Sequence, residues 1–211
     1  MTWTVNGITG RGDPPACAGG FKGLALVLGT ARSVWWDVYA LPYFTRAQPD
    51  IIAINGMVLF FKDRIHHAVS MHPPELDYWR KLRKLYQGRD ETPFLTHSYR
   101  APADCEPPDV VWDMPSGING TSGLLAVMVG LALGYNEIIL AGVPMDGQGH
   151  IYDPPGNETA DLLHEHLELE WKKIAKEYFQ GRVRSMSGRT REWLGEPTED
   201  WLGSAKPTAD H

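Results

Sequence analysis

The chain has 211 residues, a hydrophobic fraction of 43% and a formal net charge of −6. This length suits one domain that buries a substantial core. No run of about 18 apolar residues occurs, so we expect no membrane span. The first residues lack the basic and apolar regions of a signal peptide. The acidic balance argues against nucleic acid as a partner, because a nucleic-acid-binding surface is usually basic.

The cysteines favour a cytoplasmic protein without a metal site. Cys17 and Cys105 sit in loop-like stretches that lack metal-ligand spacing. Reduced thiols are therefore the expected state, and a disulfide between them is the alternative. No His-x-Glu, Cys-x-x-Cys or HExxH motif occurs, so we expect no zinc site and no bound metal. The sequence leaves the oligomeric state open, and a homo-oligomer is compatible with it.

Strand and helix patterns alternate along the chain. Short apolar runs predict strands at residues 24–28, 50–55, 66–72, 93–97, 110–114, 137–143 and 182–187. Helical spacing, or an apolar run too long for a strand, predicts helices at residues 33–43, 73–86, 124–135 and 159–180. This alternation indicates the α/β class, with a Rossmann-like three-layer domain and a mostly parallel sheet.

The domain expected from this pattern covers residues 23–195. Residues 1–22 are rich in glycine and proline and predict an irregular N-terminal arm, and residues 196–211 predict a polar C-terminal tail. In parallel sheets, ligands bind beyond the carboxyl ends of the strands. The residues that follow each predicted strand are therefore candidates for a binding or catalytic site.

The first candidate turn joins the first predicted strand to its helix and consists of Gly29, Thr30, Ala31 and Arg32. A turn of small residues exposes backbone N–H groups and the positive end of a helix dipole, and both favour an anion. The Arg32 guanidinium would add a charged donor pair. The alternative is a plain strand–helix connection that Ser33 caps.

Two further turns offer hydrogen-bonding groups. Asn55 and Gly56 end the second predicted strand, where the asparagine amide suits a base or ribose edge, or serves only as a turn residue. Thr121, Ser122 and Gly123 end a glycine-rich stretch before an apolar helix. Their spare N–H groups could hold a phosphate, and helix capping alone is the alternative.

Titratable residues follow two of the strands. Asp146 comes just after a buried strand, which is a common catalytic position, although an Asx-turn with Gly147 is the alternative. His72 follows the third strand and is expected at the ligand edge. A histidine titrates near neutral pH and could deprotonate an acceptor hydroxyl. His164 is a second candidate base, but it lies on a helix whose polar neighbours suggest a solvated face.

The order of these motifs resembles a known family. Residues 121–147, TSGLLAVMVGLALGYNEIILAGVPMDG, are similar to the Ser-Gly helix, the following strand and the loop of small bacterial CMP-sialic-acid-dependent sialyltransferases. They also resemble a broader domain family that contains archaeal hydroxymethylpterin diphosphokinase and flagellin-modifying glycosyltransferases. Weaker similarities follow in the same order at LVLGTARSV, AINGM, HAVSMHP and RVRSMSGRT, so the resemblance covers roughly residues 24–195.

The resemblance implies a nucleotide-dependent transferase, most like a glycosyltransferase that uses a CMP-type sugar donor and no tightly bound cofactor. By resemblance, Gly29, Thr30 and Ala31 would line the phosphates and Asn55 would contact the nucleotide or the transferred group. Ser122 and Gly123 would approach the nucleotide, Tyr152 would assist the leaving phosphate, and His164 would stand where the family has a catalytic histidine.

Some positions depart from the family pattern. The first turn has Ala31-Arg32 where the family has Gly-Pro, and Pro144 stands where the family has an acidic residue. Two alternative functions stay open. One is a diphosphokinase-like enzyme that uses ATP and magnesium, with Asp146 and Asp153 near the metal. The other is a non-catalytic binding or assembly protein, for example a viral one, that keeps the fold.

Overall fold

The computed structural model describes residues 2–5, 8–11, 22–87, 93–113, 121–154 and 161–203, without the side chains of residues 3–5, 8, 22, 87 and 161–165. Nine strands of this part form one sheet in the order β1-β2-β7-β6-β5-β4-β3-β8-β9. Their bounds are Thr2–Val5 (β1), Ile8–Arg11 (β2), Lys22–Leu28 (β3), Asp50–Ile54 (β4), His67–Val69 (β5), Leu95–Ser98 (β6), Val110–Asp113 (β7), Tyr135–Ala141 (β8) and Val183–Ser185 (β9).

The seven strands from β7 to β9 run parallel, as the alternating pattern predicts. β3 lies between β4 and β8, and its last residue, Leu28, pairs with Ala53 on one side and Ala141 on the other. These strands are continuous apolar runs because helices cover both faces of the sheet. The α/β fold with a mostly parallel sheet is therefore confirmed.

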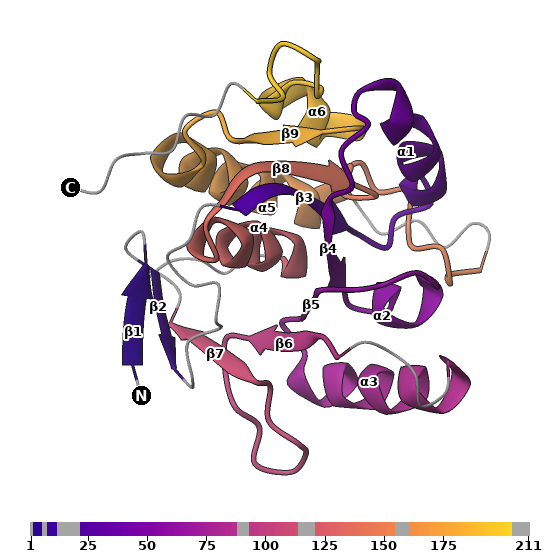
Figure 1. Ribbon diagram of the computed structural model, residues 1–211, viewed down its shortest axis with the longest axis vertical. Coiled ribbons are helices and arrows are strands. Elements are labelled where there is room, and N and C mark those ends of the chain that lie inside the picture. Colours follow the sequence, from indigo (N-terminus) through magenta and orange to yellow (C-terminus); the bar gives the residue numbers. More distant parts are fainter. Residues whose placement is uncertain are drawn as a thin grey trace.

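Helices cover the two faces of the sheet (Figure 1). α1, α2 and α3 lie on one side, and α4 and α5 lie on the other. The helix bounds are Val34–Ala40 (α1), Leu41–Tyr43 (η1), Met57–Phe60 (α2), Pro73–Gln87 (α3), Ser122–Ala132 (α4), Asp161–Ile174 (α5), the π-helical Ala175–Phe179 (η2) and Gly188–Leu194 (α6). The short helices α2 and α6 do not appear in the sequence pattern.

α4 is apolar on all sides because the protein surrounds it. All of its residues are buried. The sheet covers one side, and Trp171 and Ile174 of α5 belong to the same core on the other. A helix without a polar face needs this kind of complete cover. No helix in the described part of the chain has the length and hydrophobicity to cross a bilayer.

Both ends of the chain differ from expectation. Residues 2–5 and 8–11 are not an irregular arm: they form a hairpin, and β2 pairs antiparallel with β7, with Gly10 opposite Trp112. Among the described strands, β1 pairs only with β2, and β2 pairs in addition with β7, which is distant in the sequence, so local composition does not predict these short strands. Within the segment expected as a polar tail, Trp201 is buried, and its indole N–H donates to the Gly181 carbonyl at 2.8 Å. Residues 204–211 lie outside the described part.

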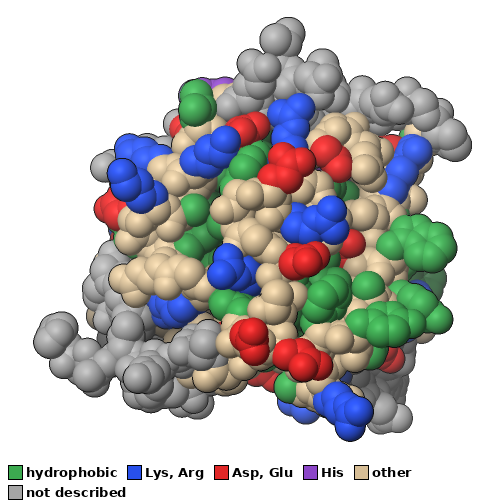
Figure 2. Space-filling view, turned by 90° about the horizontal axis from the view of Figure 1, so that it is seen from above, with side chains coloured by type: hydrophobic (Ala, Val, Ile, Leu, Met, Phe, Trp, Pro, Cys, Tyr) green, Lys and Arg blue, Asp and Glu red, His purple; other side chains and the backbone are tan. Residues whose placement is uncertain are grey.

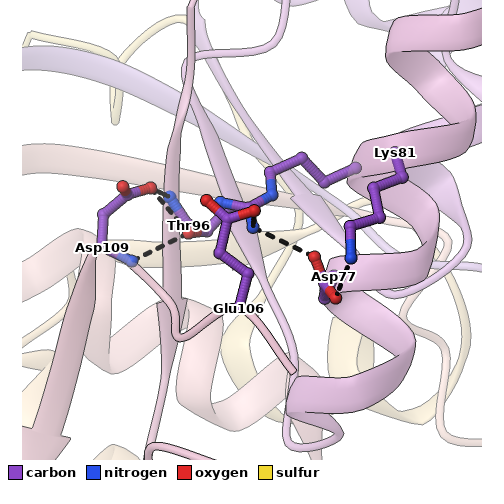
Figure 3. A network of polar contacts seen from close by, with 6 residues as sticks. Asp77, Lys81, Thr96, Glu106 and Asp109 are labelled. Carbon is purple, nitrogen blue, oxygen red and sulfur yellow. Dashed lines mark hydrogen bonds and ion pairs between the residues drawn. The ribbon is translucent and has the colours of Figure 1, made fainter. Parts of the chain in front are cut away.

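Polar contacts hold the segment between β6 and β7 against α3 (Figure 3). The Asp109 carboxylate accepts hydrogen bonds from the backbone N–H and the hydroxyl of Thr96, at 2.7 and 2.6 Å. Arg80 of α3 bridges Asp77 at 3.1 Å and Glu106 at 2.6 Å. These contacts position the parallel strands on the β7 side of the sheet.

The surface at the β9 edge of the sheet, seen from above the view of Figure 1, mixes charges of both signs. Figure 2 shows Lys, Arg, Asp and Glu side chains interspersed over this face, with large hydrophobic side chains at one edge. That edge is the side on which α1 lies in Figure 1, and α1 exposes Trp36 and Tyr39.

Candidate functional site

A cavity of about 390 Å³ opens at the carboxyl ends of the parallel strands. Its described lining consists of Gly29, Thr30, Ala31, Ile54, Asn55, His72, Thr121, Ser122, Gly123, Gly142, Val143, Pro144, Met145, Asp146, Gly147, Gln148, Gly149, His150 and Leu167. No Lys or Arg is among these residues. A ligand with a negative charge would therefore meet backbone N–H groups, hydroxyls and imidazoles rather than a cationic side chain.

The cavity brings together turns that are far apart in the sequence. The exits of β3, β4, β5 and β8 and the start of α4 all contribute to it. Thr30 and Ser122 lie on the same edge of the sheet, as parallel pairing predicts. Of the residues singled out from the sequence, the lining includes Gly29, Thr30, Ala31, Asn55, His72, Thr121, Ser122, Gly123 and Asp146.

Two glycines let the exits of β3 and β8 pass each other closely. A Cβ atom on Gly29 would lie 2.1 Å from the Gly142 carbonyl oxygen. Gly142 has a φ of +66°, and a Cβ there would lie 2.5 Å from the Cβ of Val34. Both glycines are thus required by contact between backbone segments. At Gly29 the missing side chain therefore serves the packing of the protein itself.

Strained backbone is concentrated at this cavity. Asn55 and Met145 have φ values of +51° and +57°, and both line it. Such conformations cost energy and occur often at functional sites. The Ser70 hydroxyl donates to the Asn55 side-chain oxygen at 2.8 Å. This contact orients the amide and leaves its NH₂ group as a donor toward a ligand.

The start of α4 is held from two sides. The Thr121 hydroxyl caps the helix by accepting from the Leu124 N–H at 3.2 Å, and it also accepts from the Trp171 indole at 3.2 Å. The Ser122 hydroxyl accepts from the Met71 N–H at 3.0 Å, so it connects α4 to the β5 exit. A Cβ on Gly123 would lie 3.2 Å from the Trp171 ring. Thr121 is therefore the residue that caps α4.

Three described candidates from the sequence, Arg32, Gly56 and Tyr152, are not in the lining. The Arg32 guanidinium donates to the carbonyl of Pro154 at 2.9 Å and also contacts that of Asp153, so it fastens the loop after β8. The charged donor pair expected at this turn is therefore held by backbone carbonyls and is not among the described lining residues. Gly56 starts α2, and a Cβ there would lie 3.1 Å from the Tyr152 ring. It makes room for that ring.

His150 is a lining residue that the sequence interpretation did not select. Its Nδ1 atom lies 2.7 Å from the Thr30 hydroxyl oxygen. Its ring stacks on Tyr152 with 5.1 Å between centroids, and Tyr152 stacks on Phe60 at 6.0 Å. The sequence signal for His150 was its position in a glycine-rich loop after a buried strand. A glycine-rich loop can follow many paths, so its sequence does not indicate where the histidine side chain points.

The Tyr152 phenol stays protonated over a wide pH range. Burial raises the pKa of this phenol, the Thr30 hydroxyl partly offsets that effect, and the Asp153 carboxylate adds to it. Tyr152 is 46% exposed, so one part of its ring remains accessible beside the cavity. A protonated phenol at this position can donate a hydrogen bond to an anionic group.

The buried Asp37 carboxylate of α1 holds the β8 exit in place. The Asp37 carboxylate accepts from the Gly142 N–H at 2.8 Å and from the Ser187 hydroxyl at 2.7 Å, and the Ser33 hydroxyl lies 3.4 Å from it. Burial raises the pKa of Asp37, although these hydrogen bonds and the charge of Arg191 lower it in part. Ser33 binds this cluster and makes no side-chain cap for α1.

The remaining titratable candidates differ in their surroundings. His72 is exposed and lines the cavity. The two Asp146 carboxylate oxygens accept from the backbone and side-chain nitrogens of Gln148, at 3.3 and 2.8 Å, which is the Asx-turn alternative. The side chain of His164 lies outside the described ones. Within the described residues, no three His, Cys, Asp or Glu side chains are grouped so that they could hold a metal ion.

Comparison with known proteins yields only structural neighbours. No protein-family model and no curated protein sequence matches the chain. The sialyltransferase CstII from Campylobacter jejuni in complex with cytidine-5'-monophosphate superposes with a TM-score of 0.59 and 14% identity, over 86% of this chain and 87% of that one. The chain has the fold of this sialyltransferase.

Two further structures agree with this result. CST-II in complex with a trisaccharide acceptor and CMP gives a TM-score of 0.54 at 13% identity, over 84% of this chain and 87% of that one. CstII from Campylobacter jejuni with CMP-3FNeuAc gives 0.52 at 14% identity with the same coverage. The resemblance inferred from residues 121–147 is therefore confirmed at the level of the fold.

Proposed function

We propose that this chain is a glycosyltransferase that uses a nucleotide-activated sugar of the CMP type. The observation that carries the proposal is the convergence of four strand exits and the α4 start in one cavity. Its volume lies within the range of about 300–1,000 Å³ usual for small-molecule sites. The fold, shared with proteins solved in complex with CMP, supports the choice of nucleotide.

The donor phosphate would bind without a cationic side chain from the described lining. The backbone N–H groups at the β3 exit and at the start of α4 are the proposed donors, because a helix N-terminus favours an anion. The Thr30 hydroxyl and the Tyr152 phenol lie on the same side of the cavity. The free NH₂ group of Asn55 would donate to the cytosine or the ribose.

In the proposed reaction, the acceptor hydroxyl oxygen attacks the anomeric carbon of the donor sugar. A new C–O bond forms while the bond to the phosphate oxygen breaks, and the electron pair leaves with the phosphate. Tyr152 would donate a hydrogen bond to this leaving group. The acceptor proton would pass to a histidine.

His150 is the base that the geometry favours. When its Nδ1–H donates to Thr30, its Nε2 atom carries a free lone pair that can accept a proton. His72, which also lines the cavity, and His164, which family order suggests, are the other candidate histidines. If no histidine accepts the acceptor proton, Asp146 is the next candidate for the general base. A cytoplasmic location belongs to the same proposal, and a homo-oligomer is compatible with it.

A thermal-shift panel tests the proposed donor. CMP, UDP, GDP, ADP, ATP and CMP-sialic acid are compared with and without magnesium. A ligand at about 100 times its dissociation constant adds about 2.7 kcal/mol to the free energy of unfolding. A response to the cytidine compounds alone is the expected result. An ATP response that requires magnesium would replace the proposal with a diphosphokinase-like enzyme, and no response would favour a non-catalytic protein.

A further inference from the structure

A second cavity, of about 300 Å³, lies away from the proposed reaction site. It is formed by the last turn of α5, η2, the start of β9 and the end of α6. Its size is at the lower end of the range for small-molecule sites, about 300–1,000 Å³, so a small ligand is the suitable occupant. None of the groups discussed below takes part in the chemistry proposed above.

The charged side chains that line this cavity are all positive. Lys172, Lys176 and Arg184 line it, and its described lining includes no Asp or Glu. Lys172 pairs with Glu168 at 2.6 Å, and Arg184 donates to the carbonyl of Leu194. Lys176 makes no ion pair with any described residue. The cavity therefore has an excess of positive charge that an anion would offset.

Three aromatic rings contribute to the apolar part of its wall, together with Ala175, Val183 and Leu194. Trp171 is buried, and the Phe179 ring meets it edge to face with 6.3 Å between centroids. Trp193 is half-buried and lies under the Lys172 ammonium group, 4.9 Å from it. Indole and phenyl rings favour a flat apolar partner. The cavity thus combines an apolar wall with cationic groups.

The backbone at this cavity is irregular. η2 is a π-helical turn, a conformation that is found frequently at functional sites. It ends at Gln180, which is the third non-glycine residue with positive φ in the described chain, at +49°. The space beside Gly181 is open, since a Cβ there would have no neighbour within 4 Å. The irregular turn leaves the cavity unfilled by the protein.

We propose that this second cavity binds a small organic anion with a flat apolar body, such as an aromatic carboxylate or sulfonate. The apolar body lies against Trp171, Phe179 and Trp193, and the anionic group lies between Lys176 and Arg184. This inference does not depend on the proposed transferase function. It also places the ligand next to the indole that donates to Thr121 in the first cavity.

Titration of the full-length protein with naphthalene-2-sulfonate, followed by NMR of the Trp193 indole N–H, tests this site. The signal is assigned by its loss in Trp193→Phe. We expect a saturable shift at millimolar probe, also in the presence of saturating CMP. The uncharged isostere 2-naphthalenemethanol should bind about tenfold more weakly, because it lacks the charge that the cations attract. Equal binding of the two probes, or no shift, would overturn the proposal.

A matched pair of lysine variants separates a built site from general charge attraction. Lys176→Gln removes a lining charge, and Lys173→Gln removes an exposed charge that does not line the cavity. We expect Lys176→Gln to weaken probe binding about fivefold or more and Lys173→Gln to change it less than about twofold. Equal weakening by both variants would contradict a specific site. Unchanged melting temperatures would show that both variants are folded.

Discussion

The Nδ1 atom of His150 lies 2.7 Å from the Thr30 hydroxyl, across a separation of 120 residues. The backbone supports this contact, because Ala31 forms an antiparallel bridge with His150 and the Ile151 N–H donates to the Thr30 carbonyl at 2.8 Å. The imidazole is thus held at the cavity by side-chain and backbone contacts. A base held in place before the substrate binds loses little orientational freedom in the reaction.

We expect His150→Gln to lower kcat by about a hundredfold to ten-thousandfold, the usual contribution of a general base. The dissociation constant for CMP should change only a few-fold, because the base acts on the acceptor. His72→Gln and His164→Gln are the controls, and both should keep kcat within a few-fold. A loss of hundredfold size in one of these two, with His150→Gln active, would move the base to that residue.

Tyr152→Phe tests the hydrogen bond to the leaving phosphate. Phenylalanine keeps the ring between His150 and Phe60 and removes only the hydroxyl. We expect kcat to fall by about a hundredfold with little change in KM for the donor, as for loss of one donor to a developing anion. Because the pKa of Tyr152 is raised above its ordinary value of 10.0, the wild type should show no activity loss from its ionisation below that pH. A purely structural tyrosine would leave kcat unchanged in the variant.

Gly29→Ala tests the contact between the exits of β3 and β8. The new methyl group would lie 2.1 Å from the Gly142 carbonyl oxygen, and a backbone atom cannot move aside easily. We expect the free energy of unfolding to fall by about 3 kcal/mol or more in denaturant titration. Gly23→Ala in the same strand is the control. Its Cβ would meet nothing within 4 Å, so the change should stay below about 1 kcal/mol. Equal effects of both changes would refute the steric argument.

The pH dependence of stability should show the raised pKa of Asp37. Burial makes the folded protein bind a proton at this carboxyl at a higher pH than the unfolded chain does. The unfolding free energy of the wild type should therefore rise, relative to Asp37→Asn, as pH falls from neutral toward 3.8. Parallel pH profiles for the two proteins would contradict this assignment.

Asp77→Asn should show the opposite slope. Burial raises the pKa of the Asp77 carboxyl, but Lys81 and Arg80 outweigh this effect and hold the pKa below 3.8. The ionised carboxylate thus stabilises the fold above 3.8, and this advantage over Asp77→Asn should disappear as pH falls below that value. Chemical denaturation at a series of pH values measures both variants. A difference from the wild type that persists in acid would point to packing rather than charge.

Local patterns in the sequence determined the type of each main element and the edge of the sheet that carries the site. Apolar runs such as residues 50–54 need cover on both faces, which implies a parallel sheet between helices. Parallel strands bring their carboxyl ends to one edge. Asn55 and Ser122 could therefore be placed at a common cavity without any knowledge of strand order.

The tertiary structure alone decided which groups meet there. Whether Arg32 faces the cavity or the Pro154 carbonyl, and whether His150 meets Thr30, depends on the path of a glycine-rich loop. The pairing of β2 with β7 depends in the same way on a strand about 100 residues away in the chain. The spacing of hydrophobic residues indicates which side of a segment is buried. It does not indicate which distant segment covers that side, because the hydrophobic effect favours any apolar partner and has no preferred direction.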